Sequence, residues 1–232
     1  HRSKEDEMVD KDMYQRLVGK WIYLSHTRPD IAYAVSIVSQ FLHSPRKAHL
    51  QAVHWILQYL KSSLGKIILF KRDTGLHIEA YTDADYAGSV TDRRSTSGYC
   101  VLIGGNLVTW RSKKQNVIAR SSAEAEYQAL ALGICELLWL KILMDDLKIK
   151  SQGTMRLYWD NKTAINIANN AIQNDRTKHI EEDRYFIKEK IDGGLICTPY
   201  IPSQQLADIL TKGLRNPTNL SKLGLENTYS PA

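Results

Sequence analysis

Cysteine is scarce in this chain of 232 residues. Cys100, Cys135 and Cys197 are widely spaced and odd in number, which argues against a disulfide framework and against a CxxC zinc site. Long apolar runs are missing too: no stretch approaches the roughly 20 residues that span a bilayer, and the N-terminus has no signal pattern. We therefore expect an intracellular protein of a reducing compartment and, because the chain begins at His1, a piece of something longer.

Acidic residues are outnumbered by basic ones. The 31 Lys and Arg against 25 Asp and Glu give a formal charge of +6 and a pI near 9.1. A basic surplus suits an acidic partner such as nucleic acid, although many proteins without such a partner are equally basic. The 43% of hydrophobic residues suffices for the core of one ordinary domain and an additional module.

The periodicity of apolar residues changes near residue 66. Residues 1–65 read as a small helical module, with Asp10 as the cap of its first helix, Pro29 in the first turn of the second, and Ser44 as the cap of the third with Pro45 following. The segment 66–75 is a linker with strand character.

The remainder of the chain predicts an α/β fold. Antiparallel strands come first in 76–114, with a hairpin around a Gly-Asn turn, and residues 215–232 form a tail. Between them we expect a helix from 123 to about 147, a strand at 155–160, helices at 162–169 and 177–192, a strand at 195–201 and a helix from 204 to about 214. This order is typical of a mixed sheet whose antiparallel strands lead.

Acidic side chains from several predicted elements are the candidate functional residues. In "YTDADYAGS", Asp83 and Asp85 lie two apart on a strand and therefore project to one side, unless both merely cap a turn before Gly88. Asp160 ends an apolar strand, where ligands gather in α/β sheets, although a helix N-cap is an equal alternative. Asp208 lies at the edge of an apolar helix face, and a solvated acid is its alternative.

Helix geometry separates two glutamates in "SSAEAEYQALALGICELL". Ser121 and Glu124 match a capping box, in which the glutamate folds back on the helix start. Glu126 instead shares a stripe with Leu130 and Ile134 that should face the sheet, and a buried carboxylate needs a positive partner. No strong cation accompanies these acids in the local sequence. Carboxylates gathered from several elements suit Mg²⁺ or Mn²⁺, and two such ions roughly 4 Å apart serve phosphodiester hydrolysis.

Long phrases of the sequence resemble a known family. "TRPDIAYAVSIVSQFLHSP", "YTDADYAGSVTDRRSTSGYCV", "TWRSKKQNVIARSSAEAEYQAL", "YWDNKTAI" and "ADILTKGL" are similar, in this order, to the C-terminal part of the Pol polyprotein of plant copia-type retrotransposons. The resemblance covers about residues 12–214. It implies that 1–65 are the connection-like end of a reverse transcriptase, and that 76–214 are a ribonuclease H domain, a mixed five-stranded sheet flanked by helices.

The resemblance also implies the chemistry. Two Mg²⁺ or Mn²⁺ ions would be held by Asp83, Glu126, Asp160 and Asp208, and the RNA strand of an RNA·DNA hybrid would be cut during reverse transcription, in a virus-like particle of the cytoplasm or in the nucleus. The reverse transcriptase portion of the polyprotein would be a further partner. Many family members carry a histidine in a loop before the last helix, whereas "YIPSQQLAD" has none, so His179 and Asp183 are secondary candidates for the site.

Basic residues on strand ends and loops are candidates for phosphate contacts: Arg93, Arg94, Arg111, Lys113 and Lys114. Ordinary solvated loops explain any one of them equally well. A different class of function also stays open, a non-catalytic remnant that binds nucleic acid or the polymerase. An integrase or transposase is set aside, because that class would place a glutamate in the last helix and a His/Cys zinc module upstream.

Overall fold

The computed structural model describes residues 7–72, 75–89, 91–159, 178–199, 206–212 and 223–227, and for 178–181 the backbone alone. The chain divides into two compact units. One comprises His1–Leu69 together with Gly213–Ala232, and the other comprises Phe70–Lys212.

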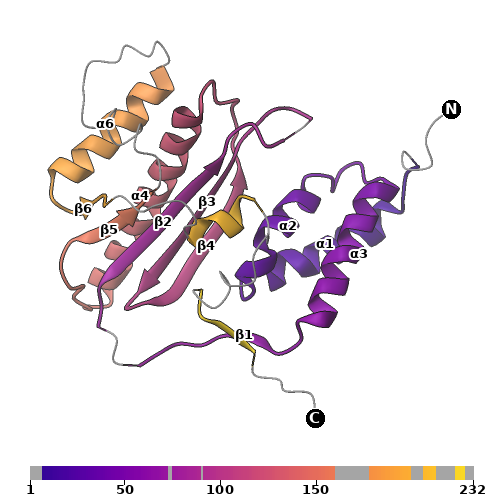
Figure 1. Ribbon diagram of the computed structural model, residues 1–232, viewed down its shortest axis with the longest axis horizontal. Coiled ribbons are helices and arrows are strands. Elements are labelled where there is room, and N and C mark those ends of the chain that lie inside the picture. Colours follow the sequence, from indigo (N-terminus) through magenta and orange to yellow (C-terminus); the bar gives the residue numbers. More distant parts are fainter. Residues whose placement is uncertain are drawn as a thin grey trace. The chain divides into compact units, whose positions relative to one another are not determined.

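The first unit is built on three helices, labelled in Figure 1. They are α1 (Lys11–Leu24), α2 (Pro29–Ser39) and α3 (Lys47–Ser62). The Asp10 carboxylate caps α1 by accepting a hydrogen bond from the Met13 amide at 3.0 Å, and Pro29 opens α2, so both predicted helix starts are confirmed. Tyr14 and Val18 of α1 are fully buried against apolar residues of the other two helices.

The third helix begins later than predicted, and the expected cap at Ser44 is wrong. The backbone at 45–47 is instead held by residues 7–9: the Val9 amide donates to the Pro45 carbonyl at 3.4 Å and the Lys47 amide to the Glu7 carbonyl at 3.0 Å. This short antiparallel bridge keeps Arg46 extended, so Arg46 becomes the N-cap. The His49 ring accepts a hydrogen bond from the Arg46 amide at 3.1 Å.

Strand β1 (Lys66–Ile68) pairs antiparallel with β7 (Leu225–Asn227), which lies in the segment expected to be a tail. Strands β1 and β7 therefore form a separate two-stranded sheet, and β1 does not belong to the larger sheet of the second unit.

A buried ion pair joins the start of α2 to the end of α3. The Arg28 guanidinium donates to both Asp30 oxygens, at 2.9 and 2.7 Å, and to the Ser63 hydroxyl at 2.8 Å. The Tyr59 hydroxyl donates to Asp30 at 2.7 Å. Arg28 and Asp30 are 8% and 5% exposed, so their charges depend on one another and on these hydrogen bonds.

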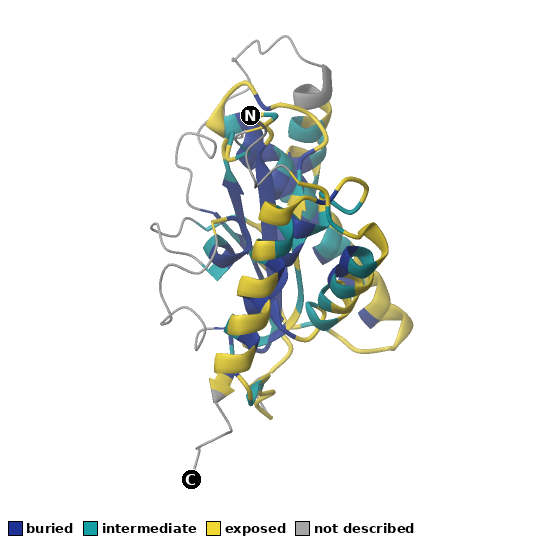
Figure 2. Ribbon diagram, turned by 90° about the vertical axis from the view of Figure 1, so that its right-hand side faces the viewer, coloured by how far each residue is buried: buried dark blue, intermediate teal, exposed yellow. Residues whose placement is uncertain are grey.

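The second unit contains a mixed five-stranded sheet in the order β4-β3-β2-β5-β6. The antiparallel strands β2 (Ile78–Asp85), β3 (Thr96–Ile103) and β4 (Asn106–Lys114) lead, and β5 (Met155–Tyr158) and β6 (Ile196–Cys197) add in parallel on the far side of β2. The predicted fold class, a mixed sheet with three leading antiparallel strands and flanking helices, is confirmed. The central strand β3 is buried along almost its whole length, and the dark blue strands of Figure 2 mark the inside of this unit.

The hairpin between β3 and β4 turns at Gly104 and Gly105 and not at Gly-Asn. Both glycines have positive φ, 56° and 74°, as the tight turn of a two-residue hairpin loop requires. Asn106 is already the first residue of β4 and pairs with Ile103.

Helix α4 (Ser122–Asp146) covers one face of the sheet, with α6 (Lys178–Asp192) beside it (Figure 1). Leu130, Ile134 and Leu137 are wholly buried against the apolar side chains of β2, β3 and β5. Within the described part of the chain, α4 is long and apolar enough to cross a membrane, by length and composition. No helix of this kind was expected from the sequence. Half of that apolar window is buried inside the unit, as in the core helix of a folded domain.

The 3₁₀ helix η2 (Leu206–Leu210) lies on the opposite face, over β3 and β2. A helix was predicted there from 204 to about 214, and the described part is this single tight helix. It fits because Gly98 of β3 has no side chain: a Cβ at that position would stand 2.8 Å from Leu210 Cβ and 2.8 Å from Thr211 Cγ2.

The buried ion pair predicts a large loss of stability when it is broken. Asp30→Asn leaves the Arg28 charge buried without its counter-ion, so we expect the free energy of unfolding of the first unit to fall by about 3 kcal/mol, measured by urea denaturation. The exposed pair Lys47–Glu7 is the matched control, and Lys47→Gln should change stability by less than about 1 kcal/mol. Equal effects of the two substitutions would contradict the assignment.

Close packing at Gly98 predicts that even one methyl group is harmful. Gly98→Ala should lower the urea midpoint of the second unit by an amount equivalent to about 1–3 kcal/mol, because η2 must move away from β3. Gly19→Ala is the control: no atom lies within 4 Å of a Cβ at this α1 position, so stability should rise slightly. An unchanged midpoint for Gly98→Ala would show that η2 adapts without loss.

Candidate functional site

Asp83 is the buried centre of the candidate site. It lies near the carboxyl end of β2 with its side chain 1% exposed, on the face that η2 covers. The Thr211 hydroxyl, which follows η2, donates a short hydrogen bond to Asp83 Oδ2. The Asp83 carboxylate is therefore fixed between a strand and the turn that ends η2.

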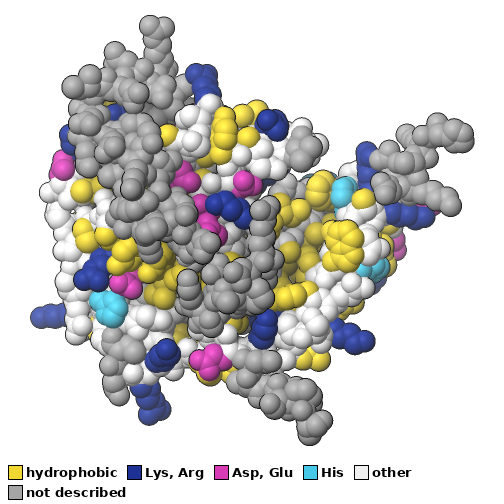
Figure 3. All heavy atoms as spheres, in the orientation of Figure 1, with side chains coloured by type: hydrophobic (Ala, Val, Ile, Leu, Met, Phe, Trp, Pro, Cys, Tyr) yellow, Lys and Arg dark blue, Asp and Glu magenta, His cyan; other side chains and the backbone are white. Residues whose placement is uncertain are grey.

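Asp208 of η2 faces the same place, and Lys212 joins the two acids. The Lys212 ammonium donates to Asp83 Oδ1 at 3.3 Å and to Asp208 Oδ1 at 3.2 Å. Acidic side chains gather around a basic one on this face in the space-filling view (Figure 3). The expectation that no strong cation accompanies the acids is wrong. The sequence signal for this cation was the spacing of four residues between Asp208 and Lys212, which brings their side chains together on one turn.

Electrostatics couple these three groups. Burial, and next the charge of Asp83, raise the pKa of Asp208 even though Lys212 is near. Burial alone lowers the pKa of the Lys212 ammonium, but the charges of Asp83 and Asp208 outweigh it and raise that pKa to about 12. The two carboxylates therefore favour the charged form of Lys212.

Glu126 reaches the same strand end from the opposite face of the sheet. Its Oε1 accepts a hydrogen bond from the amide of Ala84, the residue after Asp83, at 3.3 Å. Glu126 is 6% exposed and lies on the buried stripe, as predicted. The helix approaches β2 closely because small side chains meet there, among them Ala84, Ala125 and Ala129.

Glu124 has the structural role that its spacing predicted. The Ser121 hydroxyl accepts from the Glu124 amide at 3.1 Å, and the Glu124 carboxylate accepts from the Arg120 amide at 2.6 Å. The N-cap at Ser121 is confirmed, and Glu124 closes the helix start. Glu126 is thus the α4 acid that reaches the end of β2.

The remaining candidate acids differ in what the structure describes of them. Asp85, two residues beyond Asp83, lies against Gly88, where any Cβ would stand 1.6 Å from Asp85 Oδ2, so its surroundings are those of a turn residue. Asp160 lies outside the described residues. Strand β5 ends at Tyr158, which pairs with Tyr81, and in the sequence an acid follows each member of this pair by two residues.

Neither secondary candidate joins the acids within the described structure. The side chain of His179 lies outside the described residues. Asp183 of α6 lines a different cavity, of about 400 Å³, together with Lys113 and Cys135. Burial, and then the charges of Asp183 and Glu136, raise the pKa of the Cys135 thiol.

Basic candidates surround the end of the sheet that carries Asp83. Arg111 and Lys113 are exposed on β4, whereas Lys114 is bound to Asp92 at 2.9 Å and to the Ser89 hydroxyl at 3.0 Å. Arg94 approaches the same Asp92 at 3.7 Å. These contacts hold the pKa of the Asp92 carboxyl far below its usual range, with the Lys114 hydrogen bond as the largest cause. Arg93 has a positive φ of 57° in the same loop.

The acids of this site differ in how well their positions and their chemistry suit a divalent metal. Among the residues that the structure describes, no group of three His, Cys, Asp or Glu side chains lies close enough to hold a metal ion. The chemistry of the donors still fits: Asp83 and Asp208 present carboxylate oxygens to a shared cation, here the Lys212 ammonium, and carboxylates are the preferred ligands of Mg²⁺.

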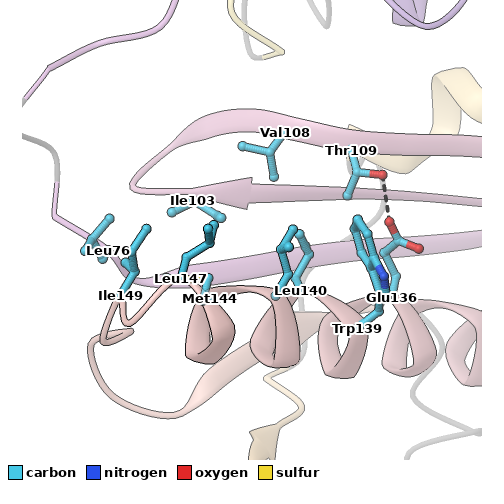
Figure 4. Close-up of a pocket in the computed structure, with 11 residues that line it drawn as sticks. Leu76, Ile103, Val108, Thr109, Glu136, Trp139, Leu140, Met144, Leu147 and Ile149 are labelled. Carbon is cyan, nitrogen blue, oxygen red and sulfur yellow. Dashed lines mark hydrogen bonds between the residues drawn. The ribbon is translucent and has the colours of Figure 1, made fainter.

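A second surface feature lies at the other end of α4. A groove of about 520 Å³ lies between this helix and the β3–β4 hairpin. Apolar side chains such as Trp139, Leu140 and Val108 line it (Figure 4). Its acid, Glu136, accepts hydrogen bonds at 2.8 Å from Thr109 and from Tyr99. With that carboxylate engaged, the groove has no resemblance to a catalytic centre.

Known proteins resemble this chain in fold and in sequence. No family model matches the chain. The protein is similar to LC11-RNase H1, solved in complex with an RNA/DNA hybrid, with a TM-score of 0.43 and 17% identity, covering 58% of this chain and 93% of that one. At this score and identity the likeness adds nothing to the fold that the sheet order already gives.

Sequence relatives are much closer. The chain is 40% identical over 209 residues to the retrovirus-related Pol polyprotein from transposon RE1 of Arabidopsis thaliana, covering 90% of this chain and 14% of the polyprotein. It is 37% identical over 222 residues to the corresponding polyprotein from transposon TNT 1-94 of Nicotiana tabacum, covering 94% of this chain and 17% of the polyprotein. The chain thus spans less than a fifth of the length of these relatives, and it belongs to the family of retrovirus-related Pol polyproteins from plant transposons.

Proposed function

We propose that the Phe70–Lys212 unit is a ribonuclease H, a metal-dependent endonuclease that cuts the RNA strand of RNA·DNA hybrids. The observation that carries the proposal is that Asp83 and Asp208 share the Lys212 ammonium at one end of β2, which Glu126 reaches from the other face of the sheet. Asp83 comes from the strand, Glu126 from the helix on one face and Asp208 from η2 on the other. Acids from separate elements are expensive to bury together, so their meeting indicates a site for cations.

The metal ligands in this proposal are Asp83, Glu126, Asp208 and Asp160. When bound, two Mg²⁺ or Mn²⁺ ions supply an activated water and stabilise the leaving oxygen of an in-line phosphodiester displacement. The protein's part is to hold its carboxylates in place beforehand. Thr211 fixes Asp83, and the Ala84 amide fixes Glu126, so little reorganisation is needed when the substrate arrives.

The RNA·DNA hybrid is the substrate class that we propose, and the kinship with retrovirus-related Pol polyproteins supports it. A hybrid is distinguished from a DNA duplex by the 2′-hydroxyl groups of one strand and by its groove shape, and neither requires sequence readout. Arg111 and Lys113 lie exposed on β4, whose Lys113 and Lys114 pair with Ser97 and Thr96 at the same end of the sheet as Asp83, so they are placed to neutralise phosphates. The reverse transcriptase portion of the polyprotein is the second partner that we propose, inside a virus-like particle or the nucleus.

One observation favours a second candidate function, a non-catalytic scaffold that binds nucleic acid or the polymerase. Lys212 already gives Asp83 and Asp208 a shared counter-ion, so a metal is not their only source of positive charge. A scaffold would bind the hybrid and leave it uncut.

The nuclease proposal predicts hybrid-specific cleavage. With Mg²⁺, a labelled RNA·DNA hybrid should be cut in its RNA strand, while an RNA duplex and a DNA duplex stay intact. Asp83→Asn and Glu126→Gln should each lower the rate by more than about 100-fold, the usual effect of losing one preorganised group that stabilises charge in the transition state.

Glu124→Gln is the matched control for Glu126→Gln, two residues away on the same helix. Glutamine also serves in a capping box, so this variant should fold and cut at nearly the wild-type rate. Equal loss in both variants would point to damage of α4, and binding of the hybrid without cleavage by the wild-type protein would favour the scaffold.

The ion pairs around Asp92 predict which lysine contacts phosphate. Lys113 is exposed, whereas Lys114 is held by Asp92 and Ser89. In hybrid binding measured from low to high salt, Lys113→Ala should reduce the slope of log K against log salt by about 1, and Lys114→Ala by clearly less. The reverse order would show that Lys114 leaves Asp92 for a phosphate.

A further inference from the structure

The cation that holds the acids together is part of the chain. Lys212 Nζ lies 3.3 Å from each Asp83 oxygen and 3.2 Å from Asp208 Oδ1. The Asp83 side chain is 1% exposed, whereas that of Lys212 is 44% exposed. Lys212 is therefore the most exposed member of this cluster, and Asp83 is the least exposed.

Lys212 is tied to the element that supplies Asp208. The amides of Thr211 and Lys212 both donate to the Asp208 carbonyl, at 3.2 and 2.9 Å. The Thr211 hydroxyl donates to Asp83 in turn. Asp208, Thr211 and Lys212 thus lie on one turn of the chain, and this turn places an acid, a hydrogen-bond donor and a positive charge next to Asp83.

A divalent ion and this ammonium need the same oxygen atoms. A metal ion on the oxygens that accept from Lys212 would stand beside the ammonium, and the two positive charges would repel each other at that distance. The half-exposed side chain has the freedom to leave toward solvent, while the buried carboxylates do not. Occupation by metal and contact with Lys212 are therefore alternatives at this site.

We propose that Lys212 is an internal counter-ion that keeps Asp83 and Asp208 assembled without metal, and that it competes with the first divalent ion to bind. The inference rests on the proposed function, since it takes these two carboxylates as metal ligands. The consequence is that Lys212 keeps the two carboxylates in position without metal and at the same time lowers their affinity for the first divalent ion. The acids stay in register when metal is absent, and every metal ion must displace the ammonium.

Calorimetric titration of the full chain with MgCl₂ and with MnCl₂, without nucleic acid, tests the competition. Lys212→Gln should bind the first ion roughly five- to tenfold more tightly than the wild type, the low end of coupling between two ligands that oppose one another, because Lys212 is half exposed. Lys212→Arg keeps the charge and should keep the weaker affinity. Lys141→Gln removes another lysine that is paired with an aspartate four residues away, and should change nothing.

Thermal unfolding gives a second readout. The metal-free Lys212→Gln protein should unfold at a lower temperature than the wild type, because two carboxylates then face each other without a counter-ion. Added Mg²⁺ should raise the unfolding temperature of this variant by more than it raises that of the wild type. A variant that folds only with Mg²⁺ would be the same result in a stronger form.

Three outcomes overturn the inference. Equal or weaker metal affinity in Lys212→Gln excludes competition, and a gain in Lys212→Arg as large as that in Lys212→Gln excludes charge as its cause. If either occurs while the wild-type protein cuts hybrids with Mg²⁺, the proposed nuclease stands and the role of Lys212 falls. If neither wild type nor Lys212→Gln binds a divalent ion, both proposals fail together.

Discussion

Two carboxylates that share a buried place must share a positive charge, and the architecture of the second unit depends on this constraint. Asp83 is nearly sealed from solvent, and Asp208 has a raised pKa because it is buried beside Asp83. Their repulsion would push η2 away from the sheet if Lys212 and Thr211 did not join them. The absence of a side chain at Gly98 then lets η2 lie directly on β3, so packing and electrostatics fix the same short segment.

The opposite face of the sheet solves a different problem with small side chains. Glu126 must reach the end of β2 from a helix whose other residues are there for apolar packing. Ala84, Ala125 and Ala129 let the first turns of α4 approach the strand, and at Gly133 a Cβ would stand only 2.5 Å from Thr82 Cγ2. Helix capping is assigned to Glu124, one position outside this contact. Position on the helix thus separates the two glutamates: Glu124 stabilises the start of α4, and Glu126 reaches the end of β2.

Periodicity and capping gave much of this organisation from the sequence alone, because both are local. The starts of α1, α2 and α4, the leading antiparallel strands and the burial of Glu126 all follow from spacing within one element. What the sequence did not reveal depends on residues far apart in the chain. The start of α3 is set by backbone pairing with residues 7–9, β7 gains its strand from β1, and Lys212 meets Asp83 from 129 residues away.

Lys212 also decides how the site should be understood. A chain whose acids were merely remnants would be stabilised by replacing them, because buried carboxylates oppose folding unless they are paired. Here one turn supplies both Asp208 and the ammonium that balances it, so the acid is maintained at the expense of a second charged side chain and a hydrogen bond from Thr211. An arrangement in which three residues hold two carboxylates in place is better explained by a function for those carboxylates than by stability. Because the Lys212 side chain is 44% exposed and that of Asp83 only 1%, the ammonium is the member of this cluster with room to move toward solvent.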